Sequence, residues 1–78
     1  GEIDLIFRHG PLIIFAEVKA RKSHSAAASS LSPKQSARLL ASAEIYLAEH
    51  CPQGQEARFD LVMVDTHAQL AILENCFQ

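Results

Sequence analysis

Two short segments decide the fold, Gly1-Glu-Ile-Asp-Leu-Ile-Phe7 and Leu12-Ile-Ile-Phe-Ala-Glu-Val-Lys19. Both are rich in the β-branched and aromatic residues that favour strands, and Arg8-His-Gly-Pro11 between them is typical of a turn. The sequence therefore predicts two strands, residues 2–7 and 12–19, joined as a hairpin. The second segment is apolar on both faces until Glu17, which predicts a central position in the sheet.

Charged side chains occur in this hairpin where a buried strand usually has none. Side chains alternate between the faces of an extended chain, so Glu17 shares a face with Lys19, and Glu2 shares a face with Asp4. Pairing of the two strands would gather these groups on one face. Charges in apolar surroundings are costly unless they are paired or bind a metal. The pattern suits a divalent cation beside a phosphodiester; a salt-bridged cluster on a solvated sheet edge is the alternative.

One helix is clearly predicted further along the chain. Ser32 is a good N-cap, Pro33 suits the first helical position, and Gln35 completes a capping box. The helix should continue to about His50, ahead of Pro52. Its apolar residues fall at spacings that form one packing stripe; they are Leu39, Leu40, Ala43, Ile45, Tyr46 and Leu47.

The remaining segments complete an α/β fold. Residues 20–31 are small and polar and predict a mobile loop. Residues 58–65 and 69–75 predict a third and a fourth strand, and Arg58 and Asp60 share a face of the third as a structural ion pair. The order β-β-α-β-β predicts a mixed sheet with the helix packed on one face.

The composition is that of one folded domain near the lower size limit for a self-supporting core. Of the 78 residues, 49% are hydrophobic and 21% charged, which excludes a disordered tail. No apolar run approaches the ~18 residues that cross a bilayer. Cys51 and Cys76 have no zinc-ligand spacing; they predict free thiols of a cytoplasmic protein, or a bridge in an oxidising compartment.

The net charge of −2 argues against strong non-specific DNA binding, but the basic residues are clustered. Five of the seven lie between positions 19 and 38, where no acid follows Glu17: Lys19, Arg21, Lys22, Lys34 and Arg38. The cluster predicts a nucleic-acid-binding flank beside the acidic site, or a solvated loop. Lys34 and Arg38 are candidate phosphate contacts, helped by the positive end of the helix dipole, or simply an exposed helix start.

These residues give the chain a resemblance to a known group of enzymes. Gly1-Glu-Ile-Asp-Leu-Ile followed by Phe15-Ala-Glu-Val-Lys-Ala-Arg21 resembles the PD-(D/E)xK nuclease superfamily, in its Holliday-junction-resolvase-like branch, and within it the bacterial YraN-type family (UPF0102). Asp4 matches the first acid, Glu17 the second and Lys19 the lysine. Further matching stretches are Ser32-Pro-Lys-Gln-Ser-Ala-Arg-Leu39, Arg58-Phe-Asp60 and Asn75-Cys-Phe77.

The resemblance implies a restriction-endonuclease-like fold and hydrolysis of DNA phosphodiesters with Mg²⁺ or Mn²⁺. Asp4 and Glu17 would be metal ligands, joined by the carbonyl of Val18, which strand geometry places between Glu17 and Lys19. Lys19 would orient the attacking water. Glu2 is a candidate auxiliary ligand or the exposed end of a strand. The resemblance also suggests that Gln35 faces the site, although capping alone accounts for it.

The resemblance also implies a longer protein and a nucleic-acid partner. Members of this family carry a helix and a strand before the Gly1-Glu-Ile-Asp4 segment, so we expect the chain to be an N-terminally truncated endonuclease-like domain. DNA is the expected partner, with branched DNA as one candidate, and a homodimer would suit a two-fold symmetric junction. The competing functions are a binding module that keeps the nuclease fold without catalysis, and a structural domain with an ion-pair network.

Overall fold

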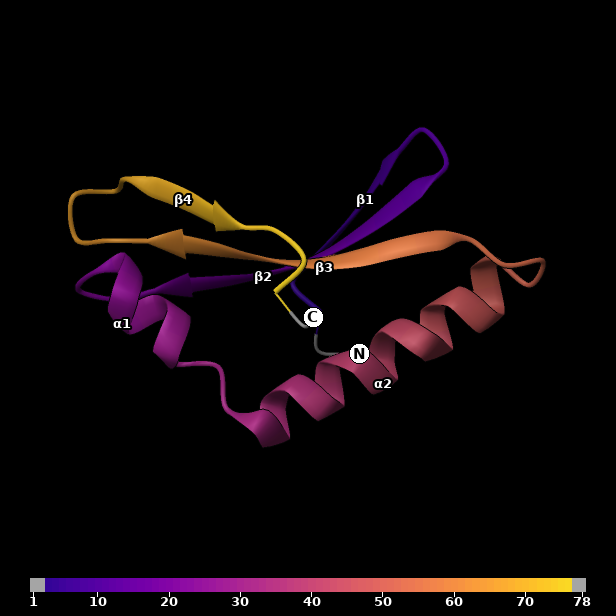
Figure 1. The fold of residues 1–78 in the computed structure, drawn as a ribbon, viewed down its shortest axis with the longest axis horizontal. Helices are drawn as coiled ribbons and strands as arrows, with labels where there is room; N and C mark the ends of the chain where they lie inside the picture. The colour runs from indigo at the N-terminus through magenta and orange to yellow at the C-terminus, as the bar shows by residue number, and fades with distance from the viewer. Residues whose placement is uncertain (1–2, 77–78) are drawn as a thin grey trace.

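In the computed structural model, the described part of the chain forms one four-stranded sheet with two helices on one side of it (Figure 1). The structure describes residues 3–76. The sheet order is β1-β2-β3-β4; β2 and β3 are parallel and the outer pairs antiparallel. The elements are β1 (Leu5–His9), β2 (Leu12–Ala20), α1 (His24–Ser29), α2 (Pro33–His50), β3 (Glu56–Val64) and β4 (Leu70–Leu73). The predicted α/β fold with a mixed sheet is confirmed, and so is the central place of β2.

A two-residue turn joins β1 to β2 and sets their register. Gly10 has a φ of 60°, the left-handed conformation that such hairpin turns require and that glycine adopts without steric cost. His9 therefore pairs with Leu12, and Leu5 pairs with Ala16 at the other end of the ladder. This register places Asp4, the residue before β1, next to Glu17 on β2.

The core lies between the sheet and the helices. Phe15 of β2 stacks on Phe59 of β3, with ring centroids 5.9 Å apart, and meets the edge of Tyr46 from α2 at 5.7 Å. Leu39 and Ala43 of α2 complete this cluster. The packing stripe predicted for the helix is therefore correct at these positions, whereas Leu40 and Ile45, also assigned to it, are exposed. We refer to this side of the sheet as the helix face.

Residues 20–31, predicted to be a mobile loop, contain the helix α1, and that prediction was wrong. Ser23 caps the helix by accepting a hydrogen bond from the Ala26 amide at 3.0 Å. Alanine has the highest helix propensity, and Ala27 is fully buried against Leu61 and Met63 of β3. A helix of six residues is marginal on its own, so this tertiary contact stabilises it.

The predicted bounds of three strands also need correction. β1 is Leu5–His9 rather than residues 2–7, because the tight turn extends pairing as far as His9, whereas Asp4 leaves the strand and uses its side chain to bond β2. β3 begins two residues earlier than expected and β4 is shorter. The helix α2 has the predicted start and end.

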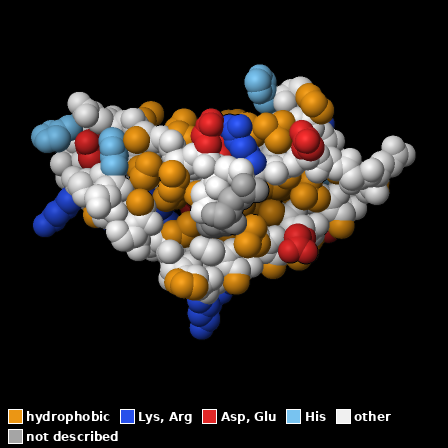
Figure 2. Space-filling model, viewed as in Figure 1, with side chains coloured by type: hydrophobic (Ala, Val, Ile, Leu, Met, Phe, Trp, Pro, Cys, Tyr) orange, Lys and Arg blue, Asp and Glu red, His pale blue; other side chains and the backbone are white. Residues whose placement is uncertain are grey.

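The other side of the sheet, which we call the open face, is largely apolar and exposed. Phe7 and Ile72 there are 49% and 61% exposed. Figure 2 shows hydrophobic side chains at the surface with charged ones among them. Among residues 3–76, no helix is long and apolar enough to cross a membrane.

Both cysteines are free and half-buried. Cys51 follows α2, and Cys76 donates its amide hydrogen to the carbonyl of Phe59 at 2.8 Å. Burial raises the pKa of the Cys76 thiol, which lowers its reactivity. The free-thiol alternative from the sequence is the one that the structure displays.

Replacing Ala68 by glycine is expected to stabilise the protein by about 0.5–1 kcal/mol. Ala68 lies in the β3–β4 turn with a φ of 59°, where the β-carbon is strained and glycine is not. Thermal unfolding of wild type and Ala68→Gly measures the gain. Ala41→Gly, on the exposed side of α2, is the matched control and should cost about 1 kcal/mol. Equal losses in both variants would contradict the prediction.

Candidate metal and nucleic-acid site

Asp4 and Glu17 meet where the β1–β2 ladder ends. The Asp4 amide donates to Oε1 of Glu17 at 3.3 Å, and Oδ2 of Asp4 accepts a hydrogen bond from the Val18 amide at 2.9 Å. The two carboxyl groups are close enough for the charge of Asp4 to act on Glu17. The convergence predicted from strand alternation is therefore present for these two acids.

Burial gives the Glu17 carboxyl an unusual environment. Glu17 is only 5% exposed, although a glutamate carboxyl is normally charged and in contact with water. Loss of solvation raises the pKa of Glu17, and the negative charge of Asp4 raises it further, while the Asp4 amide and the charge of Lys19 oppose the rise. A group that resists ionisation without a partner is well suited to a site that a cation completes.

Lys19 lies two residues beyond Glu17 on the same face of β2, close enough for its charge to act on the Glu17 carboxyl. Val18 between them is 38% exposed. Its amide is already bonded to Asp4, which fixes the orientation of the peptide that joins Glu17 to Val18. The second strand therefore presents a carboxylate, a peptide group and an ammonium group in sequence.

A cavity of about 310 Å³ joins Glu17 to the start of α2. Its walls are Glu17, Ser32, Lys34, Gln35, Arg38 and Leu39. The first turn of α2 contains no acidic residue, although acids are favoured at the positive end of a helix dipole. Lys34 and Arg38 lie near this positive end of the helix, where basic residues are unfavourable for the helix itself but would favour an anion in the cavity.

The start of α2 is fixed by local capping, as the sequence predicted. Ser32 accepts a hydrogen bond from the Gln35 amide at 3.1 Å, and Pro33 occupies the first turn. Gln35 is half-buried in the cavity wall, as the resemblance suggested. Its amide bonds Ser32, but among the hydrogen bonds of residues 3–76 its side chain does not make the return bond of a capping box. Ser32 itself also lines the cavity. The sequence identified it only as a cap, since nothing in a capping motif says what the cap faces.

Arg21 and Lys22 are exposed at the end of β2 and do not line the cavity. The Arg21 amide donates to the carbonyl of Val64 at 2.9 Å, and its guanidinium bonds the carbonyl of Ala20 at 2.7 Å. Figure 2 shows Lys and Arg side chains projecting at the loop between β2 and α1 and at the start of α2. Basic side chains therefore lie after the end of β2 and at the start of α2, and only those of α2 line the cavity with Glu17.

The donor set fits a hard divalent cation in part. Asp4 and Glu17 supply carboxylate oxygens, the ligands that Mg²⁺ and Mn²⁺ prefer, and Mg²⁺ sites commonly use one or two carboxylates. Within residues 3–76, no group of three or more His, Cys, Asp or Glu residues could hold a metal ion. Glu2, the predicted auxiliary ligand, lies outside the described residues.

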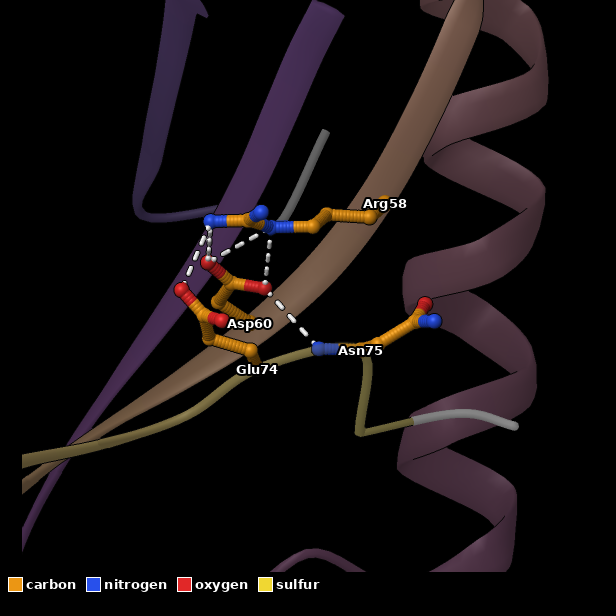
Figure 3. Close-up of polar contacts among 4 residues, drawn as sticks. All are labelled: Arg58, Asp60, Glu74 and Asn75. Carbon is orange, nitrogen blue, oxygen red and sulfur yellow. Dashed lines mark hydrogen bonds and ion pairs between the residues drawn. The ribbon is translucent and has the colours of Figure 1, made fainter.

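An ion-pair cluster of Arg58, Asp60 and Glu74 lies on the open face and has a structural role (Figure 3). Arg58 donates to Asp60 from Nε at 3.0 Å and from Nη2 at 3.1 Å, and Nη2 also reaches Glu74 at 3.1 Å. Asp60 is 4% exposed and accepts the Asn75 amide at 3.0 Å. Its register partner is Ala16, so it points away from Glu17. The predicted structural ion pair is confirmed.

The comparisons with known proteins agree on one family. The model of the uncharacterised protein family UPF0102 matches residues 1–64. Similar curated relatives are the UPF0102 proteins of Cereibacter sphaeroides (48% identity over 99% of this chain), Ruegeria pomeroyi (47% over 99%) and Roseobacter denitrificans (44% over 96%). The chain covers 67%, 63% and 59% of these relatives, respectively. It belongs to the uncharacterised protein family UPF0102.

Proposed function

We propose that this chain forms the catalytic part of a metal-dependent nuclease that hydrolyses phosphodiester bonds in DNA, branched DNA included. The observation that carries the proposal is the meeting of Asp4 with the buried Glu17, beside a cavity lined by Lys34 and Arg38. An acidic centre next to basic side chains is what binding of a metal and a polyanion together requires.

The proposed chemistry assigns separate tasks to the residues around the cavity. A bound Mg²⁺ or Mn²⁺, held by Asp4, Glu17 and the Val18 carbonyl, would activate water and neutralise charge on the phosphate. Lys19 orients the attacking water and stabilises negative charge. Gln35 is placed to bond the substrate from the cavity wall.

The basic residues bind and orient the DNA in this proposal. Lys34 and Arg38 contact a phosphate in the cavity, and Arg21 and Lys22 extend the basic flank beyond Lys19. A four-way junction is two-fold symmetric, so cleavage of both strands would use two copies of the chain, and we propose a homodimer on the DNA. The cytoplasm is the matching compartment for a DNA substrate and for two free thiols.

Metal binding and cleavage by the full-length protein test the proposal. Titration calorimetry with Mn²⁺ should show binding to wild type, weakened at least ten-fold in Asp4→Asn, because a ligand is neutralised. Supercoiled, linear and four-way-junction DNA should then be cut with Mg²⁺ or Mn²⁺ and not with EDTA.

The outcomes separate the nuclease from its competitors. DNA binding without cleavage under any metal would establish a binding module that keeps the fold. Absence of both metal and DNA binding would leave the acidic pair as a structural ion network. Neither result is compatible with the nuclease.

A further inference from the structure

His24 ties the first turn of α1 to the β3–β4 turn. Its Nε2 lies 2.9 Å from the carbonyl oxygen of Gln69 and 3.8 Å from Oδ2 of Asp65. The side chains of His24 and Asp65 are 34% and 16% exposed, so water reaches the contact only in part. The hydrogen bond at 2.9 Å requires Nε2 of the ring to carry the proton and donate it to Gln69.

The acceptor side of this tie is held rigidly. Oδ1 of Asp65 accepts the amides of His67 at 2.9 Å and Gln69 at 3.0 Å, and the Asp65 amide donates to the Gln69 carbonyl at 3.2 Å. The hydrogen bond from the Gln69 amide is the main cause that lowers the pKa of Asp65. The hydrogen bonds of Asp65 therefore fix the shape of the β3–β4 turn, and the His24 side chain binds to this turn without determining its shape.

The segment between β2 and α1 is held at both of its ends by hydrogen bonds. Arg21 is bonded through its amide to Val64, and His24 is bonded through its ring to Gln69. Arg21 and Lys22, the basic residues beside Glu17 and Lys19, lie at and between these two points. A helix of six residues cannot hold this segment without tertiary contacts.

We propose that His24 is a positioning residue for nucleic-acid binding: it holds the segment that carries Arg21 and Lys22 beside the acidic pair. The inference rests on the proposed function, because the segment needs a fixed position only if it contacts a substrate. His24 acts through these two basic residues and does not touch the substrate itself.

Binding of a four-way junction to the full-length protein in Ca²⁺, which supports binding without cleavage, tests this role. His24→Ala should weaken the affinity about five-fold, the order of one lost hydrogen bond, and should raise KM without changing kcat. His24→Gln keeps a donor for the Gln69 carbonyl and should restore affinity to within two-fold of wild type. His67→Ala, on the exposed turn, is the matched control and should bind as wild type does.

Two further measurements show whether His24 acts through its basic neighbours. In an Arg21→Gln, Lys22→Gln background, His24→Ala should have no additional effect on affinity. Hydrogen exchange of the α1 amides should rise in His24→Ala and not in His24→Gln. Faster exchange with unchanged affinity would make His24 a purely structural anchor and overturn the proposal. Failure of wild type to bind DNA would remove the proposed function and this role together, whereas equal binding by wild type and His24→Ala would remove this role alone.

Discussion

Glu17→Gln should reduce metal-dependent cleavage about a thousand-fold while stabilising the metal-free protein at pH 7. The loss follows from the proposed metal role: a neutral amide is a poor ligand for Mg²⁺, and several kcal/mol of transition-state charge stabilisation depend on the ion. Gln has nearly the same shape as Glu, so the substitution leaves the 5% exposed site filled.

The gain in stability follows from the direction of the Glu17 pKa shift. Loss of solvation raises the pKa of Glu17 in the folded protein, so the free energy of unfolding decreases as the pH rises through the unfolded-state value towards the higher folded-state value. Above that window the wild type carries the full penalty of a buried charge, and Glu17→Gln does not. Below a pH of about 4.5, the ordinary pKa of glutamate, both side chains are neutral and the difference should vanish.

Two measurements on the full-length protein check these expectations. Single-turnover cleavage of junction DNA gives the rate loss, and thermal unfolding in EDTA between pH 3.5 and 8 gives the stability difference. Glu49→Gln, at an exposed position near the end of α2, should change neither. A variant that cleaves normally would exclude Glu17 as a metal ligand, and one that is destabilised at pH 7 would show that its charge is compensated within the fold.

The meeting of Asp4 and Glu17 could be predicted in outline, but its register could not. Strand alternation places Glu17 and Lys19 on one face, and a hairpin brings Asp4 to the same region. The sequence predicted a turn over Arg8-His-Gly-Pro11, whereas the structure has a two-residue turn with Gly10, and this turn sets the register that brings Asp4 opposite Glu17. The resemblance suggested a role for these residues, and the structure supplies the contact between them.

The helix α1 and the cavity could not be predicted, because both depend on tertiary packing. The segment His24–Ser29 is mostly Ser and Ala and has no hydrophobic periodicity that would predict a helix. It is stabilised by the burial of Ala27 against β3 and by the hydrogen bond from His24 to the Gln69 carbonyl. The cavity depends on how α2 lies over the sheet, which the Ser32 cap does not determine. Capping fixes where a helix begins, and packing of distant residues fixes what that beginning faces.

The ion pair between Arg58 and Asp60 was predicted from their spacing, but its environment was not. The sequence places both on one strand face, two residues apart. The structure adds Glu74, which accepts a hydrogen bond from Arg58, and the Asn75 amide, which donates one to Asp60. Both come from the segment after β4. A pair expected to be local thereby connects β3 to the C-terminal segment.

Asp60→Ala is accordingly expected to destabilise the protein by about 3 kcal/mol. The change leaves the guanidinium of Arg58 and the Asn75 amide without their main acceptor, at a site where Asp60 is 4% exposed. Arg58 is 29% exposed and keeps Glu74, so the loss comes mainly from the hydrogen bonds that the buried carboxylate accepts and from the Asn75 amide left without an acceptor. For a domain of this size the melting temperature should fall by roughly 15 °C.

Glu74→Gln is the matched control, because it removes a carboxylate from the same Arg58 at a side chain that is 64% exposed. An exposed ion pair contributes about 1 kcal/mol or less, so the change should be small. Thermal and urea unfolding of the two full-length variants measure the contrast, and equal losses would contradict it.

The double variant Arg58→Met, Asp60→Leu should recover much of the stability, because it removes both charges and extends the apolar surface of the open face. If it does not, the bond from Asp60 to the Asn75 amide, rather than the ion pair, holds the C-terminal segment against β3.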